Sequence, residues 1–173
     1  MKKVLMMVAL VATMVLASCK PEVKTVPFLD NVKADYAELV AVHDSIIFYE
    51  AQIELDGNVS DRKAVNPLQY KEIFQGDTVV YFVERFVAND SVFNDSVNGY
   101  WMEDRPVNLD SICELNVAIE QLYKADLDLP ESNLVTLRRP LYKVEYNPMY
   151  IFGSNLTFYV AVDAVTLEVT EFE

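Results

Sequence analysis

Residues 78–87 read Thr-Val-Val-Tyr-Phe-Val-Glu-Arg-Phe-Val, a run dense in β-branched and aromatic residues. Such side chains are enriched in β-strands because they pack well on a pleated, half-buried surface. Residues 69–74 form a second run of this kind, and Gln75-Gly76-Asp77 between the two runs has turn chemistry. The pattern predicts a β-hairpin made of residues 69–74 and 78–87.

The chain after this hairpin contains further strand and helix patterns. Residues 89–99 are rich in turn formers and end the strand, and residues 100–102 are expected to add a short strand. Asn108 or Asp110 can cap a helix that runs to about residue 124, with Ile112, Leu115, Ile119 and Leu122 facing inward. Three further strands are expected at about residues 134–146, 149–163 and 165–172.

The chain before the hairpin shows a helical period. From Asn31, a good N-cap residue, apolar side chains recur at threes and fours to about Leu55, which predicts one long amphipathic helix. His43 falls on its apolar face and is expected at the edge of the core. The order of elements favours an α+β domain with two helices packed on an antiparallel sheet. A division into two small halves, residues 30–105 and 106–173, stays open.

The last predicted hairpin carries a resemblance. Residues 159–169 read Tyr-Val-Ala-Val-Asp-Ala-Val-Thr-Leu-Glu-Val and resemble the closing hairpin of PepSY and cystatin-like modules, where a strand ends in Val-Asp-x-x-Thr-Gly-x-Val. Asp163 and Thr166 are expected to make the turn through side-chain bonds to the backbone, although Leu167 replaces the usual glycine. The resemblance implies a PepSY/cystatin-like fold and a binding or inhibitory module without catalytic residues.

The first residues have the pattern of an export signal. Lys2 and Lys3 precede an apolar run over residues 4–16, which is too short to span a bilayer. The run ends in Leu16-Ala17-Ser18-Cys19, which resembles the lipobox of bacterial lipoprotein precursors. The resemblance implies that Cys19 is diacylated, with palmitate among the acyl groups, and that the signal peptidase then cuts before it. An ordinary secretory signal and a retained membrane helix are the alternatives.

This resemblance sets the expected organisation and location of the chain. Residues 1–18 are a signal peptide, residues 19–29 a tether, and residues 30–173 the folded domain. Two acyl chains anchor a protein stably, so the predicted partner of Cys19 is a membrane. Lys20 stands where many lipoproteins retained in the inner membrane have Asp, which points to the outer membrane. Whether the domain faces the periplasm or the cell surface stays open.

The charge balance limits the partners. The 173-residue chain has a net charge of −13, and removal of residues 1–18 takes away two lysines and no acids, so −13 becomes −15. An acidic protein of this kind opposes binding to nucleic acid, whose phosphates need Lys and Arg. The charge is explained by solubility, or by a cationic partner or a divalent ion.

A repeated triplet indicates a modification. Asp followed by Ser or Thr and an aliphatic residue occurs five times, and this triplet resembles the acceptor motif of a general O-glycosylation system in Gram-negative bacteria. The candidate acceptors are Ser91 and Ser96 first, then Ser45, Thr78 and Ser111. The alternative is that these residues are N-caps and turn formers.

Catalytic signals are sparse. The sequence has no Gly-x-Ser-x-Gly, His-Glu-x-x-His or Cys-x-x-Cys motif and no glycine-rich phosphate loop. One histidine cannot form a multi-histidine metal site, so no cofactor and no metal is expected. Cys113 is unpaired once Cys19 is lipidated, and it is expected to be a small buried hydrophobe. Glu84, Glu103 and Asp104 could supply a carboxylate pair of the kind glycosidases use.

Two functions follow from these observations. The favoured one is a membrane-anchored, non-enzymatic binding or inhibitory module of the cell envelope with a protein or glycan partner. The alternative is an envelope hydrolase that uses a carboxylate pair on polysaccharide or peptide. The candidates for a binding face are aromatic residues, and they include Tyr142 and Phe152. The main candidates are Tyr100, Trp101, Tyr146 and Tyr150.

Overall fold

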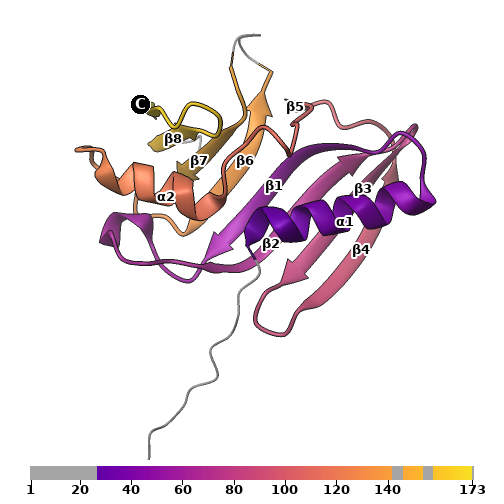
Figure 1. The fold of residues 1–173 in the computed structure, drawn as a ribbon, viewed down its shortest axis with the longest axis horizontal. Helices are drawn as coiled ribbons and strands as arrows, with labels where there is room; N and C mark the ends of the chain where they lie inside the picture. The colour runs from indigo at the N-terminus through magenta and orange to yellow at the C-terminus, as the bar shows by residue number, and fades with distance from the viewer. Residues whose placement is uncertain (1–26, 142–145, 154–157, 173) are drawn as a thin grey trace, which may run out of the picture.

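The computed structural model describes residues 27–141, 146–153 and 158–172. This part of the chain forms one nine-stranded antiparallel sheet with two α-helices and a short 3-10 helix (Figure 1). The sheet has the strand order β4-β3-β2-β1-β6-β7-β8-β9, and β5 pairs with β6 off this path. Cys19 and the proposed signal peptide lie outside the described residues.

The elements follow one another along the chain with these bounds. They are α1 (Phe28–Val42), β1 (Ile47–Leu55), η1 (Val59–Asp61), β2 (Pro67–Gln75), β3 (Val79–Phe86), β4 (Ser91–Asn98), β5 (Asp104–Arg105), α2 (Leu115–Lys124), β6 (Leu134–Pro140), β7 (Met149–Gly153), β8 (Tyr159–Asp163) and β9 (Val169–Phe172).

The predicted fold class, α+β with two helices on a PepSY/cystatin-like sheet, is wrong. The sheet dominates the structure, whereas the two helices have 15 and 10 residues. The error has a physical cause. Residues 47–55, predicted as helix, and residues 91–98, predicted as turn, form strands because neighbouring strands supply their backbone hydrogen bonds. The division into halves stays a prediction; β1 and β6, which come from the two predicted halves, pair directly from Glu50↔Arg138 to Glu54↔Leu134.

The predicted first hairpin is confirmed. Strands β2 and β3 pair antiparallel from Gln69↔Phe86 to Gln75↔Val80. Gly76 N–H donates to the Val79 carbonyl at 2.8 Å and closes the turn. The side chain of Gln75 donates to carbonyls of Gly76 and Gly99, which ties this turn to the end of β4.

The helix predicted over residues 31–55 is wrong in its second half. Helix α1 ends at Val42, and Ser45 in the following turn has a left-handed φ of 60°. The next residues form β1, which pairs with β2 on one side and β6 on the other. Ile46, Ile47 and Ile53 fit a helical period and a strand equally well, so tertiary pairing decides between them.

Strand β4 occupies residues 91–98 of the stretch 89–99 that was predicted as turn. The turn before β4 is short, and in it Asn89 accepts hydrogen bonds from the backbone N–H and the hydroxyl of Ser91. Asp90 has a φ of 51°, which Asp tolerates better than most residues. Antiparallel pairing with β3 then runs from Phe86↔Ser91 to Val79↔Asn98. Residues 100–102 do not form the expected short strand; β5 follows them at Asp104–Arg105.

The second helix is shorter than predicted. Helix α2 begins at Leu115, after Glu114 as N-cap, so Asn108 and Asp110 form a turn instead of a cap. The predicted inward face is confirmed for Leu115, Ile119 and Leu122, which are buried. Ile112 packs against the core from outside the helix.

The closing turn forms by the predicted bonds. Asp163 Oδ1 accepts from the backbone N–H of Val165 and of Thr166, both at 2.8 Å. Thr166 Oγ1 accepts from Glu168 N–H at 3.4 Å, and β8 pairs with β9. Leu167 has a φ of 66° at the position where glycine is usual, which explains that preference.

One main core forms between α1, α2 and one face of the sheet. Phe28 stacks edge-on against Tyr70, and Phe48 packs against Phe74. Glu114 Oε2 accepts from Leu29 N–H at 3.2 Å, which joins the start of α1 to the N-cap of α2. No helix in the described part of the chain is long and apolar enough to cross a membrane.

Candidate functional site

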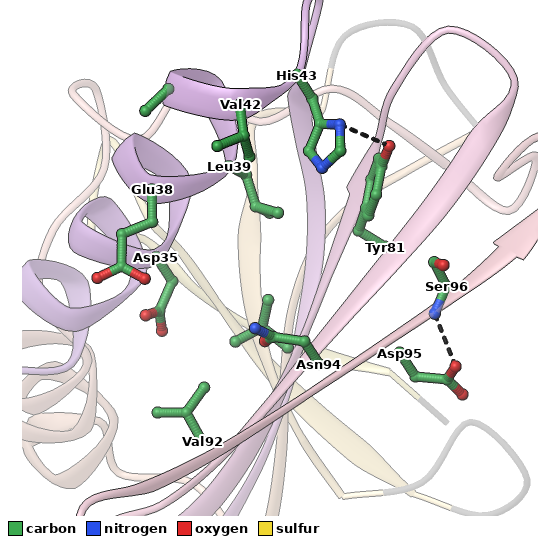
Figure 2. A pocket seen from close by; sticks show the side chains of 12 residues that line it. Asp35, Glu38, Leu39, Val42, His43, Tyr81, Val92, Asn94, Asp95 and Ser96 are labelled. Carbon is green, nitrogen blue, oxygen red and sulfur yellow. Dashed lines mark hydrogen bonds between the residues drawn. The ribbon is translucent and has the colours of Figure 1, made fainter.

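A hollow with a volume of about 730 Å³ lies between α1 and strand β4. Helix α1 supplies acidic and apolar side chains to one wall, and β3 and β4 supply the floor and the other wall (Figure 2). We call it the β4 groove. Its lining residues are Asp35, Glu38, Leu39, Ala41, Val42, His43, Tyr81, Val83, Val92, Asn94, Asp95 and Ser96.

A buried ion pair holds α1 against the sheet beneath the groove. Arg85 of β3 donates to both carboxylate oxygens of Asp35, with Nη2 to Oδ1 at 2.6 Å and Nε to Oδ2 at 3.3 Å. Its other nitrogen, Nη1, donates to Asp90 Oδ1 at 2.7 Å. The side chain of Asp35 is 5% exposed and that of Arg85 12%, so this pair is largely out of water. Such bidentate arginine contacts fix orientation as well as charge.

A second buried acid completes this cluster. Glu72 of β2 is fully buried, and within residues 27–141, 146–153 and 158–172 neither carboxylate oxygen accepts a hydrogen bond from a donor. Burial, and then the charge of nearby Asp35, raise the pKa of Glu72 well above its ordinary value. Of these two carboxyls only Asp35 accepts hydrogen bonds from Arg85, and a protonated Glu72 can itself donate to Asp35.

His43 lies at the end of α1, at one end of the groove. Its Nδ1 is 3.2 Å from the Tyr81 hydroxyl, and the two rings are 4.6 Å apart (Figure 2). The ring is half-buried, as expected for the edge of the core. Tyr36 adds a hydrogen bond to the Ile46 carbonyl, so the turn after α1 is tied to the helix.

Strand β4 forms the open rim of the groove. It is the terminal strand of the sheet, and every residue in it is exposed except the half-buried Ser91. Val92, Asn94 and Ser96 line the groove. Phe93 and Val97 are 60% and 55% exposed. Since side chains alternate along a strand, these two belong to the opposite face of the sheet.

A second carboxylate pair lies away from this groove. Glu50 of β1 is 3% exposed and Asp104 of β5 is 4% exposed. Arg138 Nε donates to Asp104 Oδ1 at 2.6 Å, and Gln52 Nε2 donates to Glu50 Oε1 at 2.7 Å. Burial, and then the hydrogen bond to Asp104, raise the pKa of Glu50 to about 8. A proton on Oε2 gives that otherwise unpartnered atom its hydrogen bond.

The acids predicted for a hydrolase are not assembled as proposed. Asp104 is buried against Glu50 and Arg138, and the backbone carbonyl of Glu103 accepts from the same guanidinium at 3.2 Å. Glu84 of β3 lines a separate shallow hollow with Gln52 and Lys71. The close carboxyl pairs are Glu50 with Asp104 and Asp35 with Glu72.

The predicted aromatic residues do not share one surface. Tyr100 is 65% exposed, whereas Tyr150 and Phe152 are fully buried in the main core. Trp101 donates from Nε1 to Asp104 at 3.2 Å and packs edge-on against Phe82. Tyr146 packs against a small separate cluster with Met149, and Tyr142 lies outside the described residues. A binding role for these residues stays a prediction.

The serine or threonine of each of the five triplets is exposed or half-buried. Ser45, Thr78, Ser96 and Ser111 are exposed and Ser91 is half-buried. Ser96 lines the β4 groove and Ser45 follows α1. Their modification stays a prediction.

Cys113 is half-buried against the main core, just before α2 instead of inside a helix. Its carbonyl accepts from the Tyr150 hydroxyl at 2.8 Å, and burial raises the pKa of its thiol. In the described part of the chain, no group of three or more His, Cys, Asp and Glu side chains could hold a metal ion. The expectation that no cofactor binds stays a prediction.

Sequence reasoning missed most of the groove. Asp35 and Glu38 are spaced as an ordinary solvated helix face, and Asn94 and Asp95 are residues that strands disfavour. The sequence does contain one indication of strand β4, because the apolar residues Val92, Phe93 and Val97 lie inside residues 89–99, which were predicted as turn. These residues suggest a short strand next to β3.

The fold and the groove together define a sheet-dominated protein with an open antiparallel edge beside a helix. This fold is similar to that of a protein from Clostridium difficile 630 described as a candidate lipoprotein, with a TM-score of 0.60 and 12% identity over 86% of this chain and 93% of that chain. No family model matches the sequence. No curated protein matches it either.

Proposed function

We propose that this protein is a lipid-anchored envelope protein that binds a partner in the β4 groove. The observation that carries the proposal is the groove itself, an open hollow of about 730 Å³ with a sheet edge as its rim. A hollow with apolar walls and a few polar groups is the usual form of a binding site. The lipobox at Cys19 and the fold shared with a candidate lipoprotein support the anchor.

The burial of both close carboxyl pairs favours binding over hydrolysis. Glu50, Asp104 and Glu72 are at most 4% exposed, and Arg85 occupies both oxygens of Asp35. A general acid or base must come within hydrogen-bond reach of its substrate. These pairs are better explained as buried structural contacts, one on each face of the sheet, that hold α1 and β5 in position.

The proposed anchor would hold the domain at a membrane. Cleavage before Cys19 and diacylation would leave residues 20–27 between the lipid and α1. We place the lipid in the outer membrane because Lys20 follows the cysteine. The triplet acceptors form a further part of the proposal, since a sugar needs a surface position and all five side chains have one.

Metabolic labelling with a fatty-acid analogue tests the anchor in the full chain. The natural chain should incorporate the label and Cys19→Ala should not. Lys20→Asp should move the labelled protein from the outer to the inner membrane fraction. An unlabelled natural chain would contradict the anchor, and an unchanged location of Lys20→Asp would contradict the assignment to the outer membrane.

Site-specific photo-crosslinking tests the groove in the same cells. A crosslinker at Asn94 should give a discrete adduct whose yield falls when Glu38 is replaced by Lys. The matched control carries the crosslinker at Glu120, an exposed residue of α2 outside the groove. An adduct of equal yield at both positions, or at neither, would contradict binding at the groove.

A further inference from the structure

We infer that β4 accepts an extended peptide segment of alternating basic and apolar residues, which pairs with it as an added strand. This inference rests on the proposed binding function and names the chemistry of the partner. Addition of a strand to an open sheet edge is a known mode of peptide recognition, in which backbone hydrogen bonds supply affinity and alternate side chains supply specificity.

The register shows which backbone groups of β4 are available. Gly99 N–H donates to the Thr78 carbonyl at 2.9 Å, so Gly99 and Thr78 occupy a hydrogen-bonded position of the ladder between β3 and β4. Hydrogen-bonded and non-hydrogen-bonded pairs alternate in an antiparallel ladder. The backbone groups of every second residue therefore point away from β3. These outward-pointing residues are Val92, Asn94, Ser96 and Asn98.

One of these outward groups is already covered. Asp95 Oδ1 accepts from Ser96 N–H at 2.7 Å (Figure 2). This bond protects part of the edge from indiscriminate pairing. The N–H groups of Val92, Asn94 and Asn98 point away from β3 and make no hydrogen bond within the described part of the chain. A partner strand can therefore pair with them.

The groove side of β4 favours a cation. Asp35 and Glu38 of α1 line the groove, and no Lys or Arg is among its lining residues, all of which lie in the described chain. Arg85 beneath the floor neutralises Asp35. Glu38 is exposed and remains to attract positive charge. The side chain of Asp95 belongs to the opposite face of β4, with Phe93 and Val97. The net charge of −13 adds a long-range field of the same sign.

The opposite side of β4 favours apolar residues. Phe93 is 60% exposed and packs edge-on against Phe86, with ring centroids 5.8 Å apart. Val97 on the same side is 55% exposed. An added strand turns successive side chains to opposite faces. Its basic residues then face the groove, and its apolar residues cover Phe93 and Val97, which flank Asp95 on that face.

A second copy of this chain fits the edge less well. Two β4 strands side by side would bring Asp95 of each copy into one small region, on proteins that both carry −13. Like charges opposed across an interface raise its free energy. Charge complementarity therefore selects a cationic segment, and self-association is an outcome that the test must detect.

The test measures binding of a synthetic nine-residue peptide of alternating lysine and valine to the full chain in non-ionic detergent, by fluorescence anisotropy. Binding should weaken with salt, and a glutamate-valine peptide should not bind. Removing the groove charge with Glu38→Gln should raise the dissociation constant about threefold. The control is Glu120→Gln, at an exposed acid outside the groove, and it should leave the dissociation constant unchanged.

A backbone variant separates strand pairing from simple charge attraction. Asn94→Pro removes an N–H that points away from β3, so stability should persist while peptide binding is lost. Asn94→Ala keeps the N–H and should bind normally. Equal loss of binding with Glu38→Gln and with Glu120→Gln, or normal binding by Asn94→Pro, overturns the inference. The inference is also overturned if sedimentation shows that the natural chain is a dimer and that Asn94→Pro abolishes this dimer.

The two proposals can fail separately. A groove adduct in cells without peptide binding in vitro overturns the added-strand partner and leaves the binding function standing. Loss of both the adduct and the peptide complex overturns both. Peptide binding that follows the predicted variants supports the added strand whatever the cellular partner is.

Discussion

Replacement of Glu50 by Gln should stabilise the protein at neutral pH. Glu50 is 3% exposed, accepts from Gln52, and has its pKa raised to about 8 by burial and by its hydrogen bond to Asp104. It is therefore protonated in the folded chain at pH 7. Glutamine is close in shape, carries no charge, and its Nε2 can donate to Asp104 as the acid proton does.

The magnitude follows from linkage between protonation and folding. A group whose pKa is raised by folding contributes stability that is fully present below its ordinary value, here 4.5, and that is lost as the pH rises through about 8. Each pH unit above the ordinary pKa of 4.5 lowers the free energy of unfolding by about 1.4 kcal/mol until the pH reaches about 8. Compared with low pH, the natural chain is therefore less stable by about 3 kcal/mol at pH 7 and by about 1 kcal/mol at pH 5. Glutamine does not titrate and avoids this loss.

Denaturant unfolding of the full chain, followed by circular dichroism at pH 5 and pH 7, measures the difference. Glu50→Gln should exceed the natural chain in free energy of unfolding by about 3 kcal/mol at pH 7 and by about 1 kcal/mol at pH 5. Glu120→Gln on the exposed face of α2 is the control and should change little. A gain that is the same at both pH values, or a loss at pH 7, would refute a protonated Glu50.

Three further substitutions test other contacts by the same unfolding measurement. Asp163→Ala removes the acceptor of two backbone N–H groups and should cost about 2 kcal/mol, while Asp163→Asn keeps the acceptor and should recover about half; equal losses would contradict this. Arg85→Met leaves Asp35 buried without its guanidinium and should cost about 3 to 5 kcal/mol, so a cost below about 1 kcal/mol would show that the pair contributes little. Tyr150→Phe removes the hydroxyl that donates to the Cys113 carbonyl and should cost about 1 kcal/mol; no change would mean that water replaces it.

The hairpins could be read from the sequence because their signals are local. Gly76 lies in the turn between two β-rich runs, and Asp163 and Thr166 carry the bonds of the closing turn. The inward face of α2 was equally legible, since Leu115, Ile119 and Leu122 repeat at helical spacing. In each case, residues within a few positions of one another determine the structure.

The candidate site could not be read in this way. Asp35 and Arg85 lie 50 positions apart in the chain and meet only because α1 packs on the sheet. Asn94 and Ser96 join them at the groove only because β4 pairs with β3. The strand β4 itself contains Asn94 and Asp95, which local propensity assigns to turns. Likewise, Glu50 and Asp104 become one pair only when β5 joins β6 next to β1.

By itself the sequence determined the hairpins, the inward face of α2, the acidic character and the lipobox pattern at Cys19, because each depends on neighbouring residues or on composition. Tertiary structure decided that residues 47–55 are strand instead of helix, that residues 91–98 are an open sheet edge, and which acids are buried in pairs. The physical reason is that a strand obtains its backbone hydrogen bonds from distant segments, so its conformation and its chemical surroundings are set by partners that no local pattern identifies.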